Sequence, residues 1–291
     1  MSSSLPEPRV PLDVEAEAAA ELINAYSRRF PGSAPVSVEE VRRWWDVDVD
    51  RETCVRIVPG GGYLDLNPRG GFWNADLRAV DPGAAAALLD WAEATAAGHP
   101  LRVWLTATDP QTAALLESRR YRRIRSSYRM ALELDAELPE PDWPEGIAVR
   151  SPLPGEERAV YEAHQEAFED HWGYVRDEWP RWRRRHFGEH QDPTLWFLAL
   201  GGPEIAGVAR CGPDLAVEGQ AWVHELAVRR PWRRRGLATA LLLNAFRELR
   251  ARGFGRVVLG VDADNTTGAV GLYERLGMHQ ESRHDIHELA S

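Results

Sequence analysis

A cluster of positive charge directly before a helix pattern is the most chemically suggestive stretch of this sequence. Arginine occupies five of the seven positions from 229 to 235, and Gly236 follows. Apolar residues at 238, 241, 242, 245 and 249 then recur at the spacing of one helical face. The first turn of a helix presents unpaired N–H groups, and arginine adds charge-assisted hydrogen bonds. This junction therefore predicts a binding site for a phosphate-bearing ligand.

The glycine pattern at this junction differs from the common nucleotide-binding loops. A Walker A loop needs a glycine, four residues and then Gly-Lys-Ser/Thr, and a Rossmann turn needs G-x-G-x-x-G. Neither pattern is present here. Gly236 and Ala238 are small, which lets an anion approach the backbone closely.

Two patterns in the second half of the chain resemble the GNAT superfamily of acyl-CoA N-acyltransferases. The run from Arg233 to Ala238 is similar to the family pattern Gln/Arg-x-x-Gly-x-Gly/Ala. The run from Asn265 to Met278 is similar to Asn-x-x-x-Ala-x-x-Leu-Tyr-x-x-x-Gly-Phe, with Met278 in place of the final phenylalanine. Together the two patterns are much more specific than either alone.

The resemblance implies that acetyl-CoA is bound along this segment as co-substrate. Backbone groups of the strand before the arginines would pair with the pantetheine arm, because this strand usually carries a bulge that splays it from its neighbour. The helix start would hold the pyrophosphate. Asn265 would bond the pantetheine or the strand-end backbone, although it also suits a helix N-cap. The other residues implied are Leu226, Ala227 and Val228 on the strand, and Arg233, Arg234, Arg235, Gly236, Leu237, Ala238 and Thr239 at the helix start.

Acyl transfer from a thioester to an amine needs a neutral amine, a polarised carbonyl and a proton for the leaving thiolate. The resemblance implies that Tyr273 donates this proton, although a tyrosine on an amphipathic helix is often a core residue. It also implies that Glu225 is the base, since many family members hold a glutamate on this strand. A strand glutamate is commonly solvent-facing as well, and the neighbouring His224 is a rival base because histidine titrates near neutrality.

A segment of aromatic and acidic residues falls where the family's first interhelical loop covers the acceptor. Asp170 would pair with an ammonium group. His171, Trp172 and Tyr174 would suit an amphipathic or cationic substrate, and packing between the two halves of the chain is the alternative. The run 181–186 is predicted to be a solvated helix face, with binding of an acidic acceptor group as its alternative.

Composition narrows the function further. The 291 residues suffice for one large or two ordinary domains, and 35 Lys+Arg against 45 Asp+Glu give a formal charge of −10. This charge argues against a general nucleic-acid or anionic-membrane binder. Cys54 and Cys211 form no C-x-x-C pair and no zinc spacing, so we predict no metal. The sequence has no signal-peptide pattern or long apolar run, which favours a cytoplasmic protein.

The order of predicted elements indicates a duplicated α/β fold with mixed sheets. Helices are expected at 13–29, 83–97, 110–119, 155–169, 237–252 and 267–276, with strands at 54–58, 63–66, 101–105, 121–134, 147–150, 194–199, 205–210, 221–228, 256–261 and 279–289. The run Leu115–Tyr121 matches Leu272–Met278, with Leu116 where Tyr273 stands. The first copy lacks the Arg-x-x-Gly-x-Ala pattern and has Asp81 before its helix. We therefore predict a degenerate GNAT-like domain at 1–135, an acidic Pro-rich linker at 136–146 and an acetyl-CoA-binding domain at 147–291.

These features predict an N-acetyltransferase that moves an acetyl group directly from acetyl-CoA to a primary amine of a small molecule. The first alternative is a protein N-terminal or lysine acetyltransferase. The second is a non-catalytic acyl-CoA-binding sensor, against which Tyr273 and Asn265 speak. We expect a monomer or homodimer that has no nucleic-acid or membrane partner.

Overall fold

The structure is a computed structural model that describes residues 7–135, 137–188, 191–265 and 267–291. The chain separates into two compact units. Unit 1 comprises Met1–Tyr128, Asp262–Asp264 and Glu281–Ser291, and unit 2 comprises Arg129–Val261 and Asn265–Gln280. Residues 281–291, which the sequence places in the second domain, thus count with unit 1. The domain limits 1–135 and 147–291 remain a prediction.

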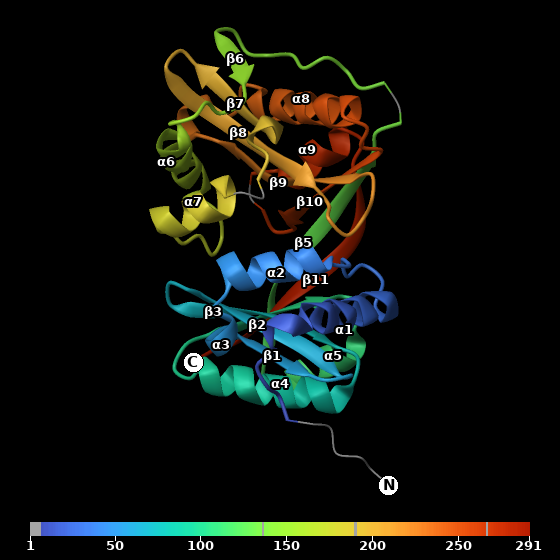
Figure 1. Ribbon diagram of the computed structural model, residues 1–291. Helices are drawn as coiled ribbons and strands as arrows, with labels where there is room; N and C mark the ends of the chain where they lie inside the picture. Colours follow the sequence, from blue (N-terminus) through green and yellow to red (C-terminus); the bar gives the residue numbers. More distant parts are fainter. Residues whose placement is uncertain (1–6, 136, 189–190, 266) are drawn as a thin grey trace. The chain divides into compact units, whose positions relative to one another are not determined.

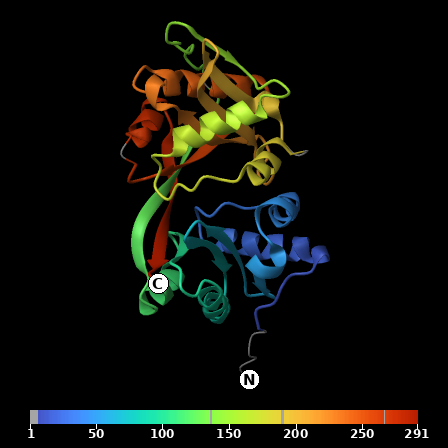
Figure 2. The ribbon, with the colours of Figure 1, turned by 90° about the vertical axis from the view of Figure 1, so that its left-hand side faces the viewer.

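Unit 1 is a mixed sheet with helices on both faces (Figure 2). Its strand order is β1-β2-β3-β4-β11, and only β3 and β4 run parallel. Its elements are η1 (Asp13–Glu15), α1 (Ala16–Arg29), α2 (Val38–Arg43), η2 (Trp44–Asp48), α3 (Arg51–Cys54), β1 (Val55–Val58), β2 (Gly62–Arg69), β3 (Phe72–Ala79), α4 (Pro82–Thr95), β4 (Leu101–Thr106), α5 (Pro110–Ser118) and part of β11 (His279–Leu289).

Alternating side chains give the unit 1 sheet two apolar faces. Ile57 and Tyr63 pack on the face covered by α1 and α2. Leu64 and Leu77 pack on the other face, against the alanines and leucines of α4. Each face therefore has its own core.

Unit 2 repeats this arrangement. Its strand order is β5-β10-β9-β8-β7-β6, with antiparallel pairs from β6 to β9 and a parallel pair of β9 and β10. Helices α6 and α7 cover one face, and α8 covers the other (Figure 1). The elements are part of β5 (Arg122–Glu133), β6 (Ile147–Arg150), α6 (Glu157–Phe168), α7 (Trp179–Phe187), η3 (Pro193–Leu195), β7 (Trp196–Gly201), β8 (Glu204–Pro213), β9 (Gln220–Val228), η4 (Arg230–Trp232), α8 (Leu237–Ala251), β10 (Arg256–Asp262) and α9 (Ala269–Arg275).

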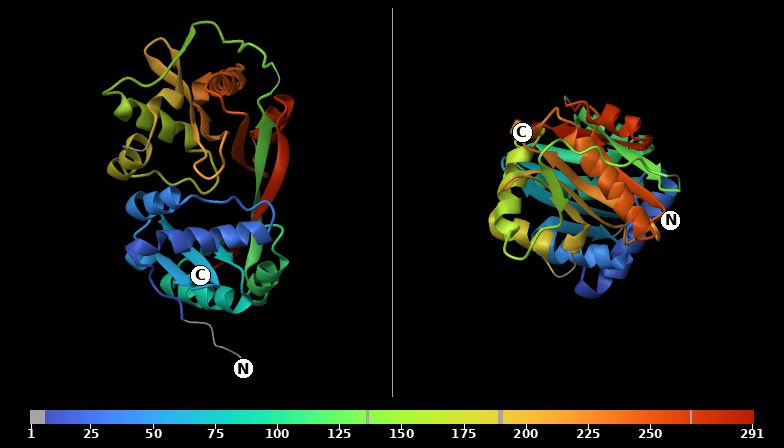
Figure 3. Two further views of the ribbon diagram at one scale, coloured as in Figure 1. Left: turned by 45° about the vertical axis from the view of Figure 1, so that its right-hand side comes forward. Right: turned by 90° about the horizontal axis from the view of Figure 1, so that it is seen from above.

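The long strands β5 and β11 each supply residues to both units. They are neighbours in the strand order and run side by side in Figure 3. Within unit 1, Ser126 of β5 donates a hydrogen bond to Asp285 of β11 at 2.7 Å. The sequence does not reveal that these strands are shared between the units, because each of them is a single uninterrupted strand pattern.

The predicted mixed α/β fold and its tandem organisation are confirmed, and helix and strand ends agree to within a few residues. One strand of unit 1 was not predicted. β3 alternates the buried Ala75, Leu77 and Ala79 with polar residues, and two of its buried positions are alanine. Its Arg78 and Asp76 form an ion pair at 2.6 Å, which lets charged residues lie within the sheet. Among the described helices, none is long and apolar enough to cross a membrane.

Candidate active site

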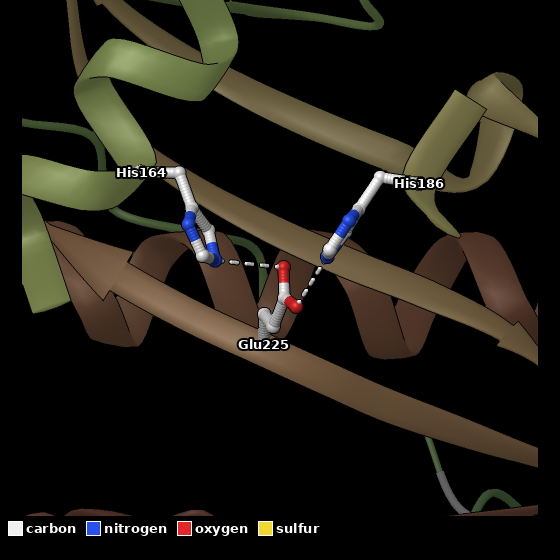
Figure 4. A group of neighbouring side chains, drawn as sticks. All are labelled: His164, His186 and Glu225. Carbon is white, nitrogen blue, oxygen red and sulfur yellow. Dashed lines mark hydrogen bonds and ion pairs between the residues drawn. The ribbon is translucent and has the colours of Figure 1, made fainter. Parts of the chain in front are cut away.

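A cluster of one carboxylate, two imidazoles and one guanidinium lies within unit 2. Figure 4 shows the carboxylate and the two imidazoles. Glu225 projects from β9, and its ladder partner Arg210 projects from β8. His164 comes from α6 and His186 from α7, so both helices that cover this face contribute. The four side chains are at most 15% exposed, and the cluster is therefore largely shielded from water.

The two carboxylate oxygens of Glu225 have different surroundings. Oε1 lies 2.9 Å from His186 Nε2 and accepts a hydrogen bond from Arg210 Nη2 at 3.2 Å. Oε2 lies 3.0 Å from His164 Nε2 and 3.2 Å from Arg210 Nε. The contacts of Oε2 are short but poorly aligned. Among the described residues, Glu225 Oε2, His164 Nε2 and Arg210 Nε therefore have no hydrogen-bond partner. Oε1 is therefore satisfied by the protein, whereas Oε2 can still accept from a ligand.

The charge of Glu225 follows from its neighbours. Burial alone would raise the pKa of this carboxyl, because an apolar environment disfavours the charged form. The positive charge of Arg210, with smaller contributions from the neighbouring imidazoles, outweighs burial and holds the pKa well below its usual range. Glu225 is therefore ionised at neutral pH. It can attract an ammonium group, but alone it is a weak proton acceptor.

Helical spacing puts both histidines on buried helix faces. His164 lies four residues after Val160 and three after Tyr161, and both of these pack in the unit 2 core. His186 lies one turn after Trp182, and their rings stack with centroids 4.4 Å apart. His186 Nδ1 also donates to the main-chain oxygen of Trp182 at 2.8 Å. The imidazole is thus fixed at both ends.

A chain of hydrogen bonds joins His164 to the predicted acceptor loop. The Tyr174 hydroxyl donates to Gln165 Oε1 at 3.0 Å, and Asp177 N–H donates to the same oxygen at 3.1 Å. Gln165 Nε2 lies 3.1 Å from His164 Nδ1. An N–H group can only donate, so Asp177 fixes which end of the Gln165 amide is oxygen. Tyr174 is thereby connected to Glu225 through two side chains.

The distances in the cluster would also suit a metal ion, since one atom each of His164, His186 and Glu225 lies within 4.8 Å of the others. Two features do not fit a metal. Arg210 places a positive charge against the same carboxylate. His164 Nδ1 accepts from the Gln165 amide, so its proton sits on Nε2 and leaves no lone pair there for a cation. The residues fit proton handling better than metal ligation.

In the described part of the chain, the end of β9 beside this cluster has no strand partner on its β10 side. The ladder with β10 runs from Gln220 to Val223 and stops, whereas β9 continues to Val228. The register against β8 shifts between Arg210, opposite Glu225, and Cys211, opposite Val223, so that His224 is the extra residue of a β-bulge. Arg229 N–H bonds towards β8, so alternation turns the peptide groups at 226 and 228 the other way. The Val228 oxygen accepts from Arg233 at 2.9 Å, so the Val228 N–H and the two groups of Leu226 fit the main-chain pairing expected for a pantetheine arm.

The rival base His224 is an exposed residue at this bulge, and its ring stacks on Trp222 with centroids 6.2 Å apart. Its ring nitrogen Nε2 lies close to the β8 backbone at Gly212. Ala227, in contrast, packs into the unit 2 core with residues of α6. Glu225, not His224, is the residue of this segment that joins the buried cluster.

The first turn of α8 is open. Gly236 is its N-cap at φ 83°, and nothing described lies within 4 Å of a Cβ added there. The first main-chain bond of the helix runs from Ala240 N–H to Gly236 oxygen. The N–H groups of Leu237, Ala238 and Thr239 therefore have no helical partner. This helix start fits an anion.

The five arginines before α8 divide into two groups. Arg229 pairs with Glu166 at 2.8 Å, and Arg230 pairs with Asp170 at 2.9 Å. Arg233 contacts Asp170 at 2.7 Å and also donates to the main-chain oxygens of Val228 and Ala167. These three arginines hold the loop to α6 and β9.

Arg234 and Arg235 form the second group, and both are exposed. In the described part of the chain neither has an acidic partner, and Arg235 lies over the Trp232 ring at 5.4 Å. Arg234 adopts a left-handed φ of 63° two residues before the left-handed Gly236. Arg234 and Arg235 are therefore better placed than Arg233 to neutralise phosphate charge.

Tyr273 lies on α9 and is 7% exposed. Burial raises its pKa to about 12, so the hydroxyl keeps its proton at neutral pH. Asn265 precedes α9, and its side-chain oxygen accepts from Thr267 N–H at 2.6 Å. The helix itself starts at Ala269 with Gly268 as N-cap, so Asn265 shapes the turn before the helix and is not its cap.

The predicted acceptor residues have different environments. Hydrogen bonds from Arg230 and Arg233 hold the pKa of Asp170 far below its usual range, and its carboxylate is engaged with the arginine loop. The His171 ring lies 4.4 Å from that of Phe168, and Trp172 is 39% exposed. Tyr174 is the member that connects to the Glu225 cluster.

The helix of unit 1 that corresponds to α8 has a capped first turn. Asp81 caps α4 by accepting from Ala84 N–H at 2.9 Å, and Pro82 has no N–H to offer. At the start of α4 the Asp81 carboxylate thus occupies the position that corresponds to the proposed anion site at the start of α8. The start of α4 is therefore less suited to an anion than the start of α8, in agreement with the prediction of a degenerate first copy.

His164, His186 and Arg210 were not predicted as site residues. The spacing of Trp182 and His186 on one helix face was a usable signal, because a histidine one turn from a buried tryptophan is buried as well. His186 is 2% exposed, so the prediction of a solvated face for the whole run 181–186 is wrong at this residue. Which carboxylate it meets depends on tertiary packing, which the sequence does not reveal.

The fold, the open helix start and the buried carboxylate define an acyl-CoA-dependent N-acyltransferase. The model of the Acetyltransferase (GNAT) family matches residues 158–278. The chain is similar to proteins named mycothiol acetyltransferase, one from Salinispora arenicola (33% identity over 249 residues, 78% of this chain and 76% of the relative) and one from Salinispora tropica (33% identity, 81% and 80%). The chain belongs to the GNAT acetyltransferases and is an N-acetyltransferase.

Solved structures resemble the chain over nearly its whole length. A GCN5-related N-acetyltransferase from Sphaerobacter thermophilus has a TM-score of 0.80 at 33% identity, covering 98% of this chain and 96% of that chain. A tandem GNAT protein from the clavulanic acid biosynthesis pathway has a TM-score of 0.73 at 17% identity, covering 98% and 97%. The second likeness shows the fold and its tandem organisation.

Proposed function

We propose that this N-acetyltransferase moves the acetyl group of acetyl-CoA directly to the primary amine of a small molecule. The observation that carries this proposal is the buried Glu225 cluster, with a carboxylate oxygen that can still accept a hydrogen bond. In this proposal the end of β9 beyond the β10 ladder would pair with pantetheine, and the open start of α8 would bind pyrophosphate.

The acceptor class rests on the relatives. Proteins named mycothiol acetyltransferase match about four-fifths of the chain. The small-molecule amine that such a protein acetylates is therefore the first candidate acceptor. The cluster offers a single buried carboxylate, which suits one ammonium group. We therefore expect a compact amine, and short peptides are the alternative acceptors to be tested.

In the proposed reaction, Glu225 attracts the ammonium group at Oε2 and takes its proton. The neutral amine attacks the thioester carbonyl, so that a C–N bond forms and the C–S bond breaks. As the C–S bond breaks, the nitrogen releases its second proton to water, while Tyr273 donates its hydroxyl proton to the departing sulfur and is reprotonated from water. A peptide N–H of β9 would polarise the carbonyl oxygen, since the groups at 226 and 228 point away from β8. The net products are an amide, free CoA and one proton.

The test incubates the protein with acetyl-CoA and each amine of a panel, and chromatography measures the consumption of acetyl-CoA. The panel contains amino sugars, polyamines, amino acids, S-protected cysteinyl glycosides and short peptides. Saturable turnover with one class, lost in Glu225→Gln, would support the proposal. Tight acetyl-CoA binding by calorimetry without turnover of any amine would contradict it and favour a sensor.

A further inference from the structure

Both ring nitrogens of His186 face oxygens that can only accept hydrogen bonds. Nδ1 lies 2.8 Å from the main-chain oxygen of Trp182, and Nε2 lies 2.9 Å from Glu225 Oε1. A neutral imidazole carries a single N–H, so one of these contacts would otherwise bring two lone pairs together. A proton must therefore lie at each nitrogen, and the pair of His186 and Glu225 holds one proton between Nε2 and Oε1.

His164 is the opposite case. Asp177 N–H fixes the oxygen of Gln165, so the Gln165 amide nitrogen donates to His164 Nδ1 at 3.1 Å. The proton of a neutral His164 then sits on Nε2, which lies 3.0 Å from Glu225 Oε2. His164 needs no second proton to satisfy its contacts.

We propose that Glu225 and His186 act as one proton-accepting pair, in which Glu225 takes the acceptor's proton and His186 Nε2 stores it. This inference rests on the proposed function. The N–H bond of the ammonium breaks and an O–H bond forms at Glu225. After the carboxyl group turns, that O–H bond breaks and the Nε2–H bond of His186 forms. The contacts in the structure are those of the pair that already holds the proton. The pair acts as a base only after it has lost this proton.

The surroundings explain why two residues are needed. Arg210 lowers the basicity of the carboxylate, whereas an imidazole is matched to proton transfer near neutral pH. Among the described residues, the charged and titratable groups around His186 are Glu225 on β9, Arg210 on β8 and His164 on α6, and Arg185 of α7 faces Asp177 at 3.9 Å. The rings of Trp182 and Trp196 complete the shell and keep water out.

The other side of the carboxylate is where the acceptor belongs. Glu225 Oε2 and His164 Nε2 are buried, close and poorly aligned to each other, and His164 is only 8% exposed. An ammonium group or a water at this point would donate to Oε2. The acceptor's proton thus arrives at Oε2, and after the product leaves, the stored proton returns through Glu225 to water at this same point. Because His186 acts through Glu225, it is a positioning residue.

Nitrogen NMR on the full-length protein with ¹⁵N-labelled histidine tests the pair without any ligand. The chain has nine histidines, and single His→Gln variants assign the signals. At about pH 7 we expect His186 to carry protons on both nitrogens and His164 on Nε2 only. Glu225→Gln should remove the Nε2 proton of His186 and leave its Nδ1 proton. The exposed His279→Gln should leave both residues unchanged.

Two results would overturn the inference: a His186 protonated on Nδ1 alone in the wild type, or an unchanged His186 in Glu225→Gln. The NMR measurement does not need turnover, so failure of every amine in the panel would reject the proposed function separately. With an active amine, the rate below the pH optimum should rise about tenfold per pH unit in the wild type. His186→Gln should flatten this rise, and an unchanged slope would also count against the pair.

Discussion

His186 Nε2 lies 2.9 Å from Glu225 Oε1, and the stacked ring of Trp182 holds the imidazole from behind. This contact ties α7 to β9, and His164 ties α6 to the same carboxylate. The residue proposed as the base is therefore also a buried connection between the helices and the sheet of unit 2. The proposed function and the stability of unit 2 therefore involve the same contacts.

Glu225→Gln is expected to lower the free energy of unfolding by about 3 kcal/mol at neutral pH, because His186 and Arg210 lose a buried anionic partner. The pKa of Glu225 is lower in the folded than in the unfolded state. Its contribution is therefore fully present above the unfolded value of about 4.3 and is lost as the pH falls through the folded value. Urea unfolding of wild type and variant at several pH values measures both effects.

The control for this variant is Glu162→Gln. Glu162 pairs with Arg158 at 2.6 Å on the exposed side of α6, and its side chain is 45% exposed. Its loss should cost less than about 1 kcal/mol at any of these pH values. Equal losses in the two variants would contradict the view that the Glu225 pairs are buried and stabilising.

Tyr273→Phe is expected to lower kcat about 100-fold and to leave the affinity for acetyl-CoA nearly unchanged. In the described residues its hydroxyl has no hydrogen-bond partner, so the proton is available and its loss removes no internal contact. Burial raises the pKa of Tyr273 to about 12, so this residue should not reduce turnover as the pH rises towards 10, roughly the value of a free tyrosine.

Steady-state kinetics and calorimetry on the same samples separate these effects. Tyr121→Phe is a matched control, since Tyr121 is a buried tyrosine of unit 1 that donates to Glu93 at 3.2 Å. It should keep the wild-type kcat. A Tyr273→Phe enzyme with wild-type kcat would rule out Tyr273 as the proton donor.

Gly236→Val is expected to weaken acetyl-CoA binding at least about tenfold. A β-branched residue at φ 83° is strained by about 1–2 kcal/mol, and its side chain would stand over the free N–H groups of α8. Gly98→Val is the matched control, because Gly98 has φ 84° and equally open space in unit 1. Calorimetry with acetyl-CoA should show a loss in the first variant alone, and similar losses in both would refute the helix-start site.

The arrangement of elements could be predicted from the sequence because each element depends on local spacing. The α8 start and the Tyr273 region were found from two short patterns. The Glu225 cluster was found only in part, since its four members come from α6, α7, β8 and β9. Partners such as Arg210 are set by strand register, and a one-residue slip would turn Arg210 to the other face of the sheet.

The environment of charged residues was the least predictable feature. Asp170 was predicted to meet the acceptor's ammonium group, and in the structure it pairs with Arg230 and Arg233. In a loop, several cationic groups could pair with a carboxylate equally well, and the fold determines which of them lies within reach. Arg234 and Arg233 are adjacent in sequence, yet a left-handed backbone at Arg234 sends the chain in a new direction.

The last prediction concerns the two cysteines. Both are free and buried, Cys54 in unit 1 and Cys211 on β8 beside Arg210. Burial raises the pKa of Cys211 to about 12, and the charge of Arg210 offsets only part of this effect. Burial also raises the pKa of Cys54. Since the thiolate is the nucleophile, neither residue should react with Ellman's reagent in the native protein at about pH 8.

In denaturant both thiols should react, which gives two equivalents per chain and an internal standard. Comparison of the native and denatured absorbance, with Cys211→Ala and Cys54→Ala as assignments, measures each site. Rapid reaction of Cys211 in the native protein would show that β8 opens towards solvent next to Arg210. Because Cys211 directly follows Arg210 on β8, its side chain lies on the opposite face of the sheet, so a silent Cys211 would show that the face covered by α8 excludes the reagent.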